Sequence, residues 1–206
     1  MHVDFLEHEA VWRIADDFRQ SPALQGYNIP PIDVMFVVDV QLGFDVIEID
    51  DLFDDLRMDA AIVPAEKTLY IDRHSLDQWE QKKGWIEKRL RFTLAHELGH
   101  YFLHRAYLAD LSFNNLPEFK RLMLAHGNNR RLEEQANEFA GRFLVPPDLF
   151  RQEYNVLCSS LTKANVDWRV VPGMREYFAK KMAPRFGVNA QVIETRLDHE
   201  GLWPQE

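Results

Sequence analysis

The residues His96-Glu97-Leu98-Gly99-His100 combine two imidazoles and a carboxylate at a spacing that can bind a metal ion and use it. They match the His-Glu-x-x-His pattern. Two histidines four positions apart lie on one face of a helix, so both rings can reach one zinc ion at about 2.0–2.1 Å. Glu97 lies one step around the helix, where it can take a proton from a water on that ion. The pattern predicts a Zn²⁺ site with His96 and His100 as ligands and Glu97 as the general base.

The residues around the motif distinguish a buried metal helix from an ordinary amphipathic helix that carries two surface histidines. Apolar side chains flank the motif on both sides and favour the buried helix: Phe92, Leu94, Ala95, Leu98, Phe102 and Leu103. Gly99 costs a helix about 1 kcal/mol relative to alanine. A residue this small lets another backbone approach, which is a reason for the helix to tolerate that cost.

A catalytic zinc ion usually has three protein ligands and one open position, so a third ligand is needed. Ala106 stands where a metzincin would place its third histidine. His104 follows His96 by eight residues, about 12 Å along a helix, which is too far for both to share one ion. We therefore expect His104 to be a hydrogen-bonding residue near the helix end.

Glu133 is the better candidate for the third ligand, with Glu134 as the alternative. Glu133, Ala136, Asn137 and Ala140 follow the spacing i, i+3, i+4, i+7, so they share one face of a helix. The small residues on that face would let this helix pack closely on the metal helix and bring the carboxylate within reach. A solvated surface charge is the ordinary role of a helical glutamate and the alternative for both residues.

The residues of the site must be positioned by a few strands followed mostly by helices. This order of elements predicts an α+β fold, with a small mixed or antiparallel sheet packed on the metal-binding helix. We expect one domain over 1–206, with N-terminal helices within 1–43 and helical C-terminal residues over 170–206. The expected elements are helices over 5–19 and 31–42, strands over 44–49, 60–63 and 68–72, a helix over 85–105, an irregular stretch over 109–117, a helix over 132–144 stopped by Pro146-Pro147, and final helices from Pro172 broken at Pro184, Gly187 and Gly201.

Composition and charge exclude several classes of function. The formal net charge is -9, so general coating of nucleic acid is disfavoured because phosphates would repel the chain. The single cysteine, Cys158, cannot form an internal disulfide, and we assign it no role. We find no secretory signal and no run of roughly 18 to 20 apolar residues that could span a membrane. A cytoplasmic protein is expected.

Several of these motifs together resemble the ImmA/IrrE family of zinc metallopeptidases. The resemblance covers roughly residues 35–200 and rests on the run from Arg91 to His100, on His104, on Glu133-x-x-Ala136-Asn137-x-Phe139-Ala140 and on Phe143-Leu144-Val145-Pro146. It implies a zincin-like fold in which His96, His100 and Glu133 hold zinc and Glu97 is the general base. Residues Leu69 to Asp72 resemble the family's edge strand, which in zincins pairs with an extended substrate.

The resemblance also implies a partner, because members of the family cleave helix-turn-helix repressors or antitoxins. An acidic surface would suit such a basic, DNA-binding substrate. Residues 183–202 resemble the family's helix-turn-helix-like C-terminal segment. We interpret that segment as a helical cap, because residues 169–206 carry nearly balanced charge and lack an electrostatic footprint for phosphate. We see neither a separate N-terminal DNA-binding domain nor a C-terminal sensory domain.

The residue that stabilises the oxyanion and the choice between an enzyme and two other functions stay open at this point. A tetrahedral oxyanion needs a further hydrogen-bond donor, and His126, Tyr101 and Tyr70 are candidates by residue type. The chain could also sequester its repressor or antitoxin without cleaving it, with zinc in a purely structural role. Structural zinc sites usually have four protein ligands, so three ligands beside Glu97 favour an enzyme. A third possibility, a DNA-binding regulator, would use residues 165–206.

Overall fold

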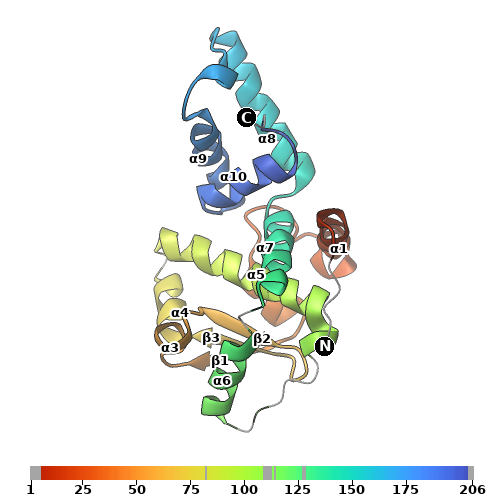
Figure 1. The fold of residues 1–206 in the computed structure, drawn as a ribbon, viewed down its shortest axis with the longest axis vertical. Coiled ribbons are helices and arrows are strands. Elements are labelled where there is room, and N and C mark those ends of the chain that lie inside the picture. The colour runs from red at the N-terminus through yellow and green to blue at the C-terminus, as the bar shows by residue number, and fades with distance from the viewer. Residues whose placement is uncertain (1–5, 82, 109–112, 114, 127–128, 204–206) are drawn as a thin grey trace.

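The computed structural model describes residues 6–81, 83–108, 113, 115–126 and 129–203. This part of the chain is mainly helical and contains one three-stranded sheet, so the predicted α+β class is confirmed (Figure 1). The elements are α1 (His8–Gln20), a 3₁₀ turn (Pro22–Leu24), α2 (Val34–Phe36) with a π-helical continuation (Val37–Gln41), β1 (Asp45–Ile49), α3 (Leu52–Leu56), β2 (Ala60–Val63), β3 (Thr68–Asp72), α4 (Arg73–Glu80), α5 (Gly84–Leu108), α6 (Leu116–His126), α7 (Arg130–Leu144), α8 (Pro147–Lys163), a 3₁₀ turn (Trp168–Val170), α9 (Met174–Phe186) and α10 (Ala190–His199).

The sheet is mixed, with the strand order β1-β3-β2. β3 pairs in parallel with β1 and antiparallel with β2. The prediction that Leu69 to Asp72 form an edge strand is therefore wrong, because β3 is the central strand. The strand that borders α5 and has a free edge is β2. The local sequence pattern predicted where the strands lie, but it does not contain their pairing, which joins residues distant in sequence.

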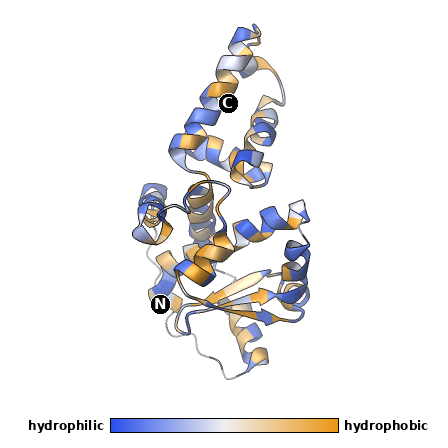
Figure 2. Ribbon diagram, turned by 180° about the vertical axis from the view of Figure 1, so that it is seen from behind, coloured by the Kyte–Doolittle hydropathy of each residue, from blue (hydrophilic) through white to orange (hydrophobic). Residues whose placement is uncertain are grey.

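Side chains alternate between the two faces of the sheet and enter two different cores. Ala60, Ile62, Leu69 and Ile71 belong to the main core, together with apolar residues of α5 and α7. The opposite face, which includes Ala61 and Val63, joins a smaller core with residues of α6. Figure 2 shows the strands mainly in the hydrophobic colour, as expected for a sheet that is covered on both faces.

The packing of α5 on α7 depends on Gly99. A Cβ atom at this position would lie 2.9 Å from the Cα atom of Ala136 and 3.0 Å from its carbonyl oxygen. Gly99 and Ala136 are fully enclosed, and the two helix backbones meet at this point. The predicted close approach at Gly99 is confirmed, and it sets the distance between the two helices that carry the candidate ligands.

Gly99→Ala is expected to destabilise the protein although alanine is the better helix former. The added methyl group meets backbone atoms that cannot rotate away. Overpacking of this kind costs about 1–3 kcal/mol, more than the roughly 1 kcal/mol gained in helix propensity over most of that range. Thermal unfolding should show a lower Tm for Gly99→Ala. Gly84→Ala is the matched control on the same helix, since its Cβ would meet nothing within 4 Å. Equal Tm values for the two variants would contradict this account of the contact.

Helices α8, α9 and α10 form a smaller lobe at one end of the molecule, stacked above α5 and α7 (Figure 1). Helix α8 was not predicted from the sequence. Pro147 does end the run from α7, but it also occupies the first turn of α8, where proline is tolerated. The predicted break at Pro184 is wrong, because α9 continues through it to Phe186. Phe178, Met182 and Phe186, spaced four apart, are buried along one face of α9, and this burial outweighs the one backbone hydrogen bond that proline removes. Among the described residues, no helix is long and apolar enough to cross a membrane.

Candidate metal centre

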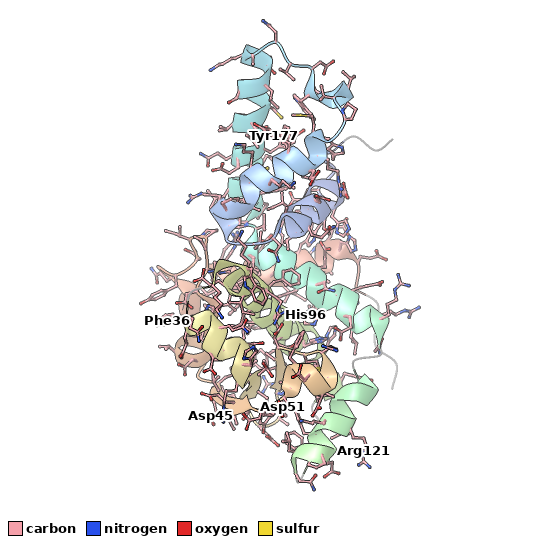
Figure 3. The ribbon with its side chains drawn as sticks, turned by 90° about the vertical axis from the view of Figure 1, so that its left-hand side faces the viewer. Phe36, Asp45, Asp51, His96, Arg121 and Tyr177 are labelled. Atoms are coloured by element: carbon pink, nitrogen blue, oxygen red, sulfur yellow. The ribbon has the colours of Figure 1, made fainter. Side chains whose placement is uncertain are left out.

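The structure brings His96, His100 and Glu133 together between α5 and α7. The Nε2 atoms of His96 and His100 are 2.9 Å apart. The Glu133 carboxylate lies against both, with 3.2 Å from Oε2 to His96 Nε2 and 3.3 Å from Oε1 to His100 Nε2. All three side chains are half-buried, and Figure 3 shows His96 inside the larger part of the molecule. Three donor atoms converge on one point, which is the arrangement that a metal ion with two imidazole ligands and one carboxylate ligand requires.

A hydrogen-bonded chain orients the ring of His100. Its Nδ1 atom lies 3.0 Å from Nδ1 of His104, and Nε2 of His104 lies 2.9 Å from Oε1 of Gln135. An amide oxygen only accepts, so His104 donates from Nε2 and accepts at Nδ1, and His100 donates from its own Nδ1. This order of protons leaves Nε2 of His100 without a proton and directed at the cluster, as a metal ligand must be.

His96 is oriented in the same way by Asn137 on α7. The Asn137 side-chain oxygen lies 2.9 Å from Nδ1 of His96 and accepts a hydrogen bond from it. Nε2 of His96 is then the free nitrogen. Helix α7 therefore contributes a carboxylate to the centre, orients His96 directly through Asn137, and orients His100 indirectly through Gln135 and His104. The donor set fits a borderline cation such as zinc.

Glu97 is buried next to the first histidine and is held by the sheet. Its Oε2 atom accepts a hydrogen bond of 2.8 Å from the backbone N–H of Ile62, on the free edge of β2. Only 5% of its surface is exposed. One carboxylate oxygen is thus fixed by the strand, while Oε1 stays available to accept a proton.

The surroundings shift the pKa values of four groups at the centre in different directions. Burial raises the pKa of Glu97, against the opposing effect of His100 and His96. Burial alone would raise the pKa of Glu133 too, but its contacts with His100 and His96 hold that pKa well below its ordinary value. For His96, burial lowers the pKa, and Glu133 and Glu97 more than compensate, so the net shift is upward. Burial lowers the pKa of His104 to about 4, so this ring is neutral near pH 7 and can accept the hydrogen bond from His100.

The remaining candidates from the sequence lie elsewhere. Glu134 is exposed and pairs with Arg130 at 2.6 Å, so α7 turns it away from the cluster. Tyr101 packs its ring against Phe44, with the ring centroids 5.0 Å apart. Tyr70 is on the sheet face opposite α5, where its hydroxyl donates to Glu66 at 3.1 Å. His126 is the last residue of α6, but its side chain and the following Gly127 and Asn128 lie outside the described residues.

Asn137 and Gln135 were not predicted to be partners of the histidines, although both contact them. Asn137 was visible as the i+4 neighbour of Glu133 on the same helix face, which was the available signal. Gln135 gave no such signal, because its position beside His104 depends on how α7 is rotated against α5. The expectation that His104 is a hydrogen-bonding residue is confirmed, with the addition that its partner is the candidate ligand His100.

His104→Phe is expected to weaken zinc binding about 10- to 100-fold, the usual effect of losing a partner that orients a metal ligand. Phenylalanine is also a flat ring, slightly larger than histidine, but it cannot accept a hydrogen bond from His100, which then loses the constraint on its tautomer. A competition titration with a chromophoric chelator measures the affinity. His74→Phe is the control, because His74 lies on α4 and contacts Gln78 instead. Unchanged affinity in His104→Phe would show that His100 needs no such partner.

A small mixed sheet beneath a helix that carries the His-Glu-x-x-His motif, with a glutamate supplied by a second helix, defines a zincin-like, metallopeptidase-type centre. The chain belongs to the Peptidase M78 family, described by its IrrE N-terminal-like domain, which it matches over residues 87–198. The matched region begins inside α5 and ends inside α10, so it contains His96, Glu97, His100 and Glu133. Comparisons with curated proteins and with solved structures found no significant match.

Proposed function

We propose that this chain is a zinc-dependent endopeptidase that hydrolyses a peptide bond in a helix-turn-helix repressor or antitoxin. The observation that supports this most directly is the convergence of His96, His100 and Glu133 next to a buried Glu97. Membership of a peptidase family supports the class of reaction. In the proposed site His96, His100 and Glu133 hold the zinc ion.

The side chains around the centre have separate tasks in the proposed reaction. Bound zinc would polarise the scissile carbonyl and lower the pKa of a water molecule toward about 7. Glu97 accepts the proton of the attacking water at Oε1 and transfers it to the leaving amine. The Ile62 N–H holds the other oxygen of Glu97, so the base does not have to be ordered at the moment of reaction. His104 and Asn137 keep the imidazoles in the tautomers that binding requires.

The proposed partner follows from charge and from the family resemblance. The chain contains 33 acidic residues and 24 lysines and arginines, so its field attracts a basic protein and repels nucleic acid. A DNA-binding repressor or antitoxin has such a basic surface. Direct binding of nucleic acid by this chain forms no part of the proposal.

The direct test is to incubate the purified, zinc-loaded protein with helix-turn-helix repressors or antitoxins from its own genome, starting with any encoded by neighbouring genes, and to analyse the products by mass spectrometry. Specific fragments are expected, and 1,10-phenanthroline should prevent their formation because it removes the metal. Adding back zinc should restore them.

Binding without fragments would overturn the proposal and favour sequestration, in which the chain holds its partner intact. Fragments that form equally well in the presence of the chelator would also overturn it, since the reaction would not then depend on the metal. A salt-dependent complex with duplex DNA would instead indicate the DNA-binding regulator.

A further inference from the structure

A second group of metal-binding side chains lies outside the centre described above. His8, Glu138 and His199 each offer one ligand atom, and these three atoms all lie within 4.8 Å of one another. They come from the first turn of α1, the middle of α7 and the last turn of α10. We propose that they form a second binding site for a divalent transition metal ion, with Zn²⁺ as the test ion.

The donor chemistry is that of the first centre: two imidazoles and one carboxylate. This combination suits zinc and its neighbours in the first transition row better than magnesium or calcium, which prefer oxygen ligands. The ring centroids of His8 and His199 are 4.7 Å apart, and Nδ1 of His199 is 2.7 Å from Oε2 of Glu138. Two ligands of a tetrahedral zinc ion are roughly 3.4 Å apart. Both histidines are exposed, so small rotations of their side chains would complete the coordination.

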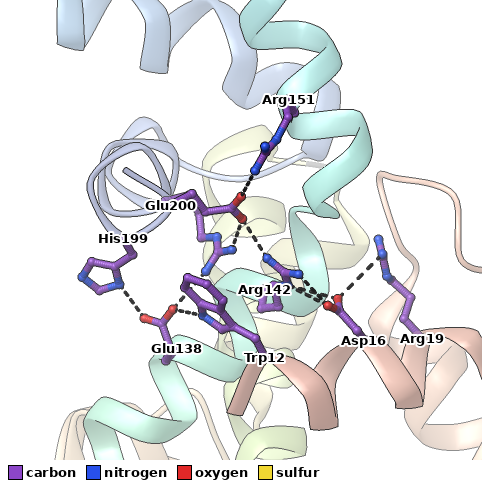
Figure 4. Close-up of polar contacts among 9 residues, drawn as sticks. Trp12, Asp16, Arg19, Glu138, Arg142, Arg151, His199 and Glu200 are labelled. Carbon is purple, nitrogen blue, oxygen red and sulfur yellow. Dashed lines mark hydrogen bonds and ion pairs between the residues drawn. The ribbon is translucent and has the colours of Figure 1, made fainter. Parts of the chain in front are cut away.

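The carboxylate of Glu138 is held in a fixed orientation, as ligands of metal ions commonly are. Its Oε1 atom accepts from the indole N–H of Trp12 and from Nη1 of Arg196, the latter at 2.9 Å. Figure 4 shows Glu138 between Trp12 and His199. With Oε1 occupied, Oε2 is the oxygen that faces His199 and can bind an ion. Glu138 is only 6% exposed, so this orientation is set by packing as well as by hydrogen bonds.

The neighbouring charges predict a weaker site than the first one. Arg196 lies beside Glu138 and is buried, and its positive charge opposes a cation there. Glu200 also pairs with Arg196 and reduces this effect. We therefore expect the site of His96, His100 and Glu133 to bind zinc more tightly than the site of His8, Glu138 and His199.

The site opens to a pocket of about 560 Å³ lined by α5, α7 and α10 together with His8. Water molecules or a partner's side chain can therefore complete the coordination from the pocket. The pocket is also lined by Asn137, which orients His96. An ion held here would join α1 and α10 to α7 next to the first centre, and it would raise the thermal stability of the whole chain.

The test is to titrate the metal-free protein with Zn²⁺ against a chromophoric chelator and to count the equivalents bound. The wild-type chain should bind two, the second more weakly. His8→Ala and His199→Ala should each bind only the tighter one. His8 is exposed in the first turn of α1, and alanine is a good helix former, so the fold should tolerate the change. His74→Ala, which removes an exposed histidine from α4, should still bind two.

The two sites can be separated in the double variant His96→Ala/His100→Ala, which should bind one weak equivalent. This one bound zinc ion would be held by the second site alone. Its binding does not depend on whether the chain is a peptidase. A wild-type stoichiometry of one would overturn the second site. So would two equivalents in both His8→Ala and His199→Ala, or none in the double variant.

Discussion

Glu97→Gln is expected to reduce peptide hydrolysis by about 10²–10⁴-fold, the usual contribution of a general base. Glutamine has nearly the same shape and can still accept the hydrogen bond from the Ile62 N–H through its amide oxygen. It cannot take a proton from water. The change therefore removes one chemical task and keeps the packing of a side chain that is 5% exposed. Initial rates with a verified substrate measure the loss.

Zinc content and folding must be followed in the same variant. Zinc binding should be unchanged, since Glu97 is not a proposed ligand, and Tm should stay close to the wild-type value. Glu134→Gln is the matched control: it makes the same chemical change on α7 at an exposed residue that pairs with Arg130, and it should cleave at the normal rate. Normal cleavage by Glu97→Gln would assign the base to another group.

Glu133→Ala is expected to weaken zinc binding by more than about 100-fold. Loss of a residue that only orients a ligand costs roughly 10–100-fold, and loss of a ligand itself should exceed that range. The carboxylate contacts both imidazoles at 3.2 and 3.3 Å and completes the three-residue group that could hold an ion here. Without it, two neutral histidines must hold a dication alone. Zinc affinity measured by chelator competition, together with zinc content after gel filtration, reports the effect.

The adjacent residue again provides the comparison. Glu134→Ala removes the same charge from the same turn of α7 and should leave zinc affinity within about twofold of the wild type, because outward-facing surface changes have small effects. If Glu134→Ala lost zinc and Glu133→Ala retained it, the ligand assignment would move to Glu134. Activity should follow zinc occupancy in both variants.

The two variants should affect zinc binding and activity differently, because Glu97 and Glu133 have different tasks. Glu97→Gln should separate activity from zinc binding, whereas Glu133→Ala should lose both. A sequestering protein with structural zinc would show no dependence on Glu97, and its partner binding would fail only when Glu133 is changed. Comparing the two variants therefore tests the enzyme against its main alternative.

Local spacing in the sequence determined the candidate ligands on α5 and the positions of most elements. His96 and His100 are one helical turn apart, and that relationship holds in any α-helix. Strands 60–63 and 68–72 are found where two short apolar segments separated by a turn predicted them. The face shared by Glu133, Ala136 and Ala140 also follows from helical spacing alone, and the structure does bring Glu133, rather than Glu134, beside the histidines.

Only the tertiary structure decided which separate segments meet. The order β1-β3-β2 made β3 central and gave the free edge to β2, whose Ile62 holds Glu97. The contact between Gly99 and Ala136 fixed how α7 lies on α5, and that placement put Gln135 next to His104. The cluster of His8, Glu138 and His199 joins residues up to 191 positions apart. Helical and strand periodicities are set by each residue's near neighbours, whereas these contacts depend on how whole elements pack, and no short stretch of sequence contains that information.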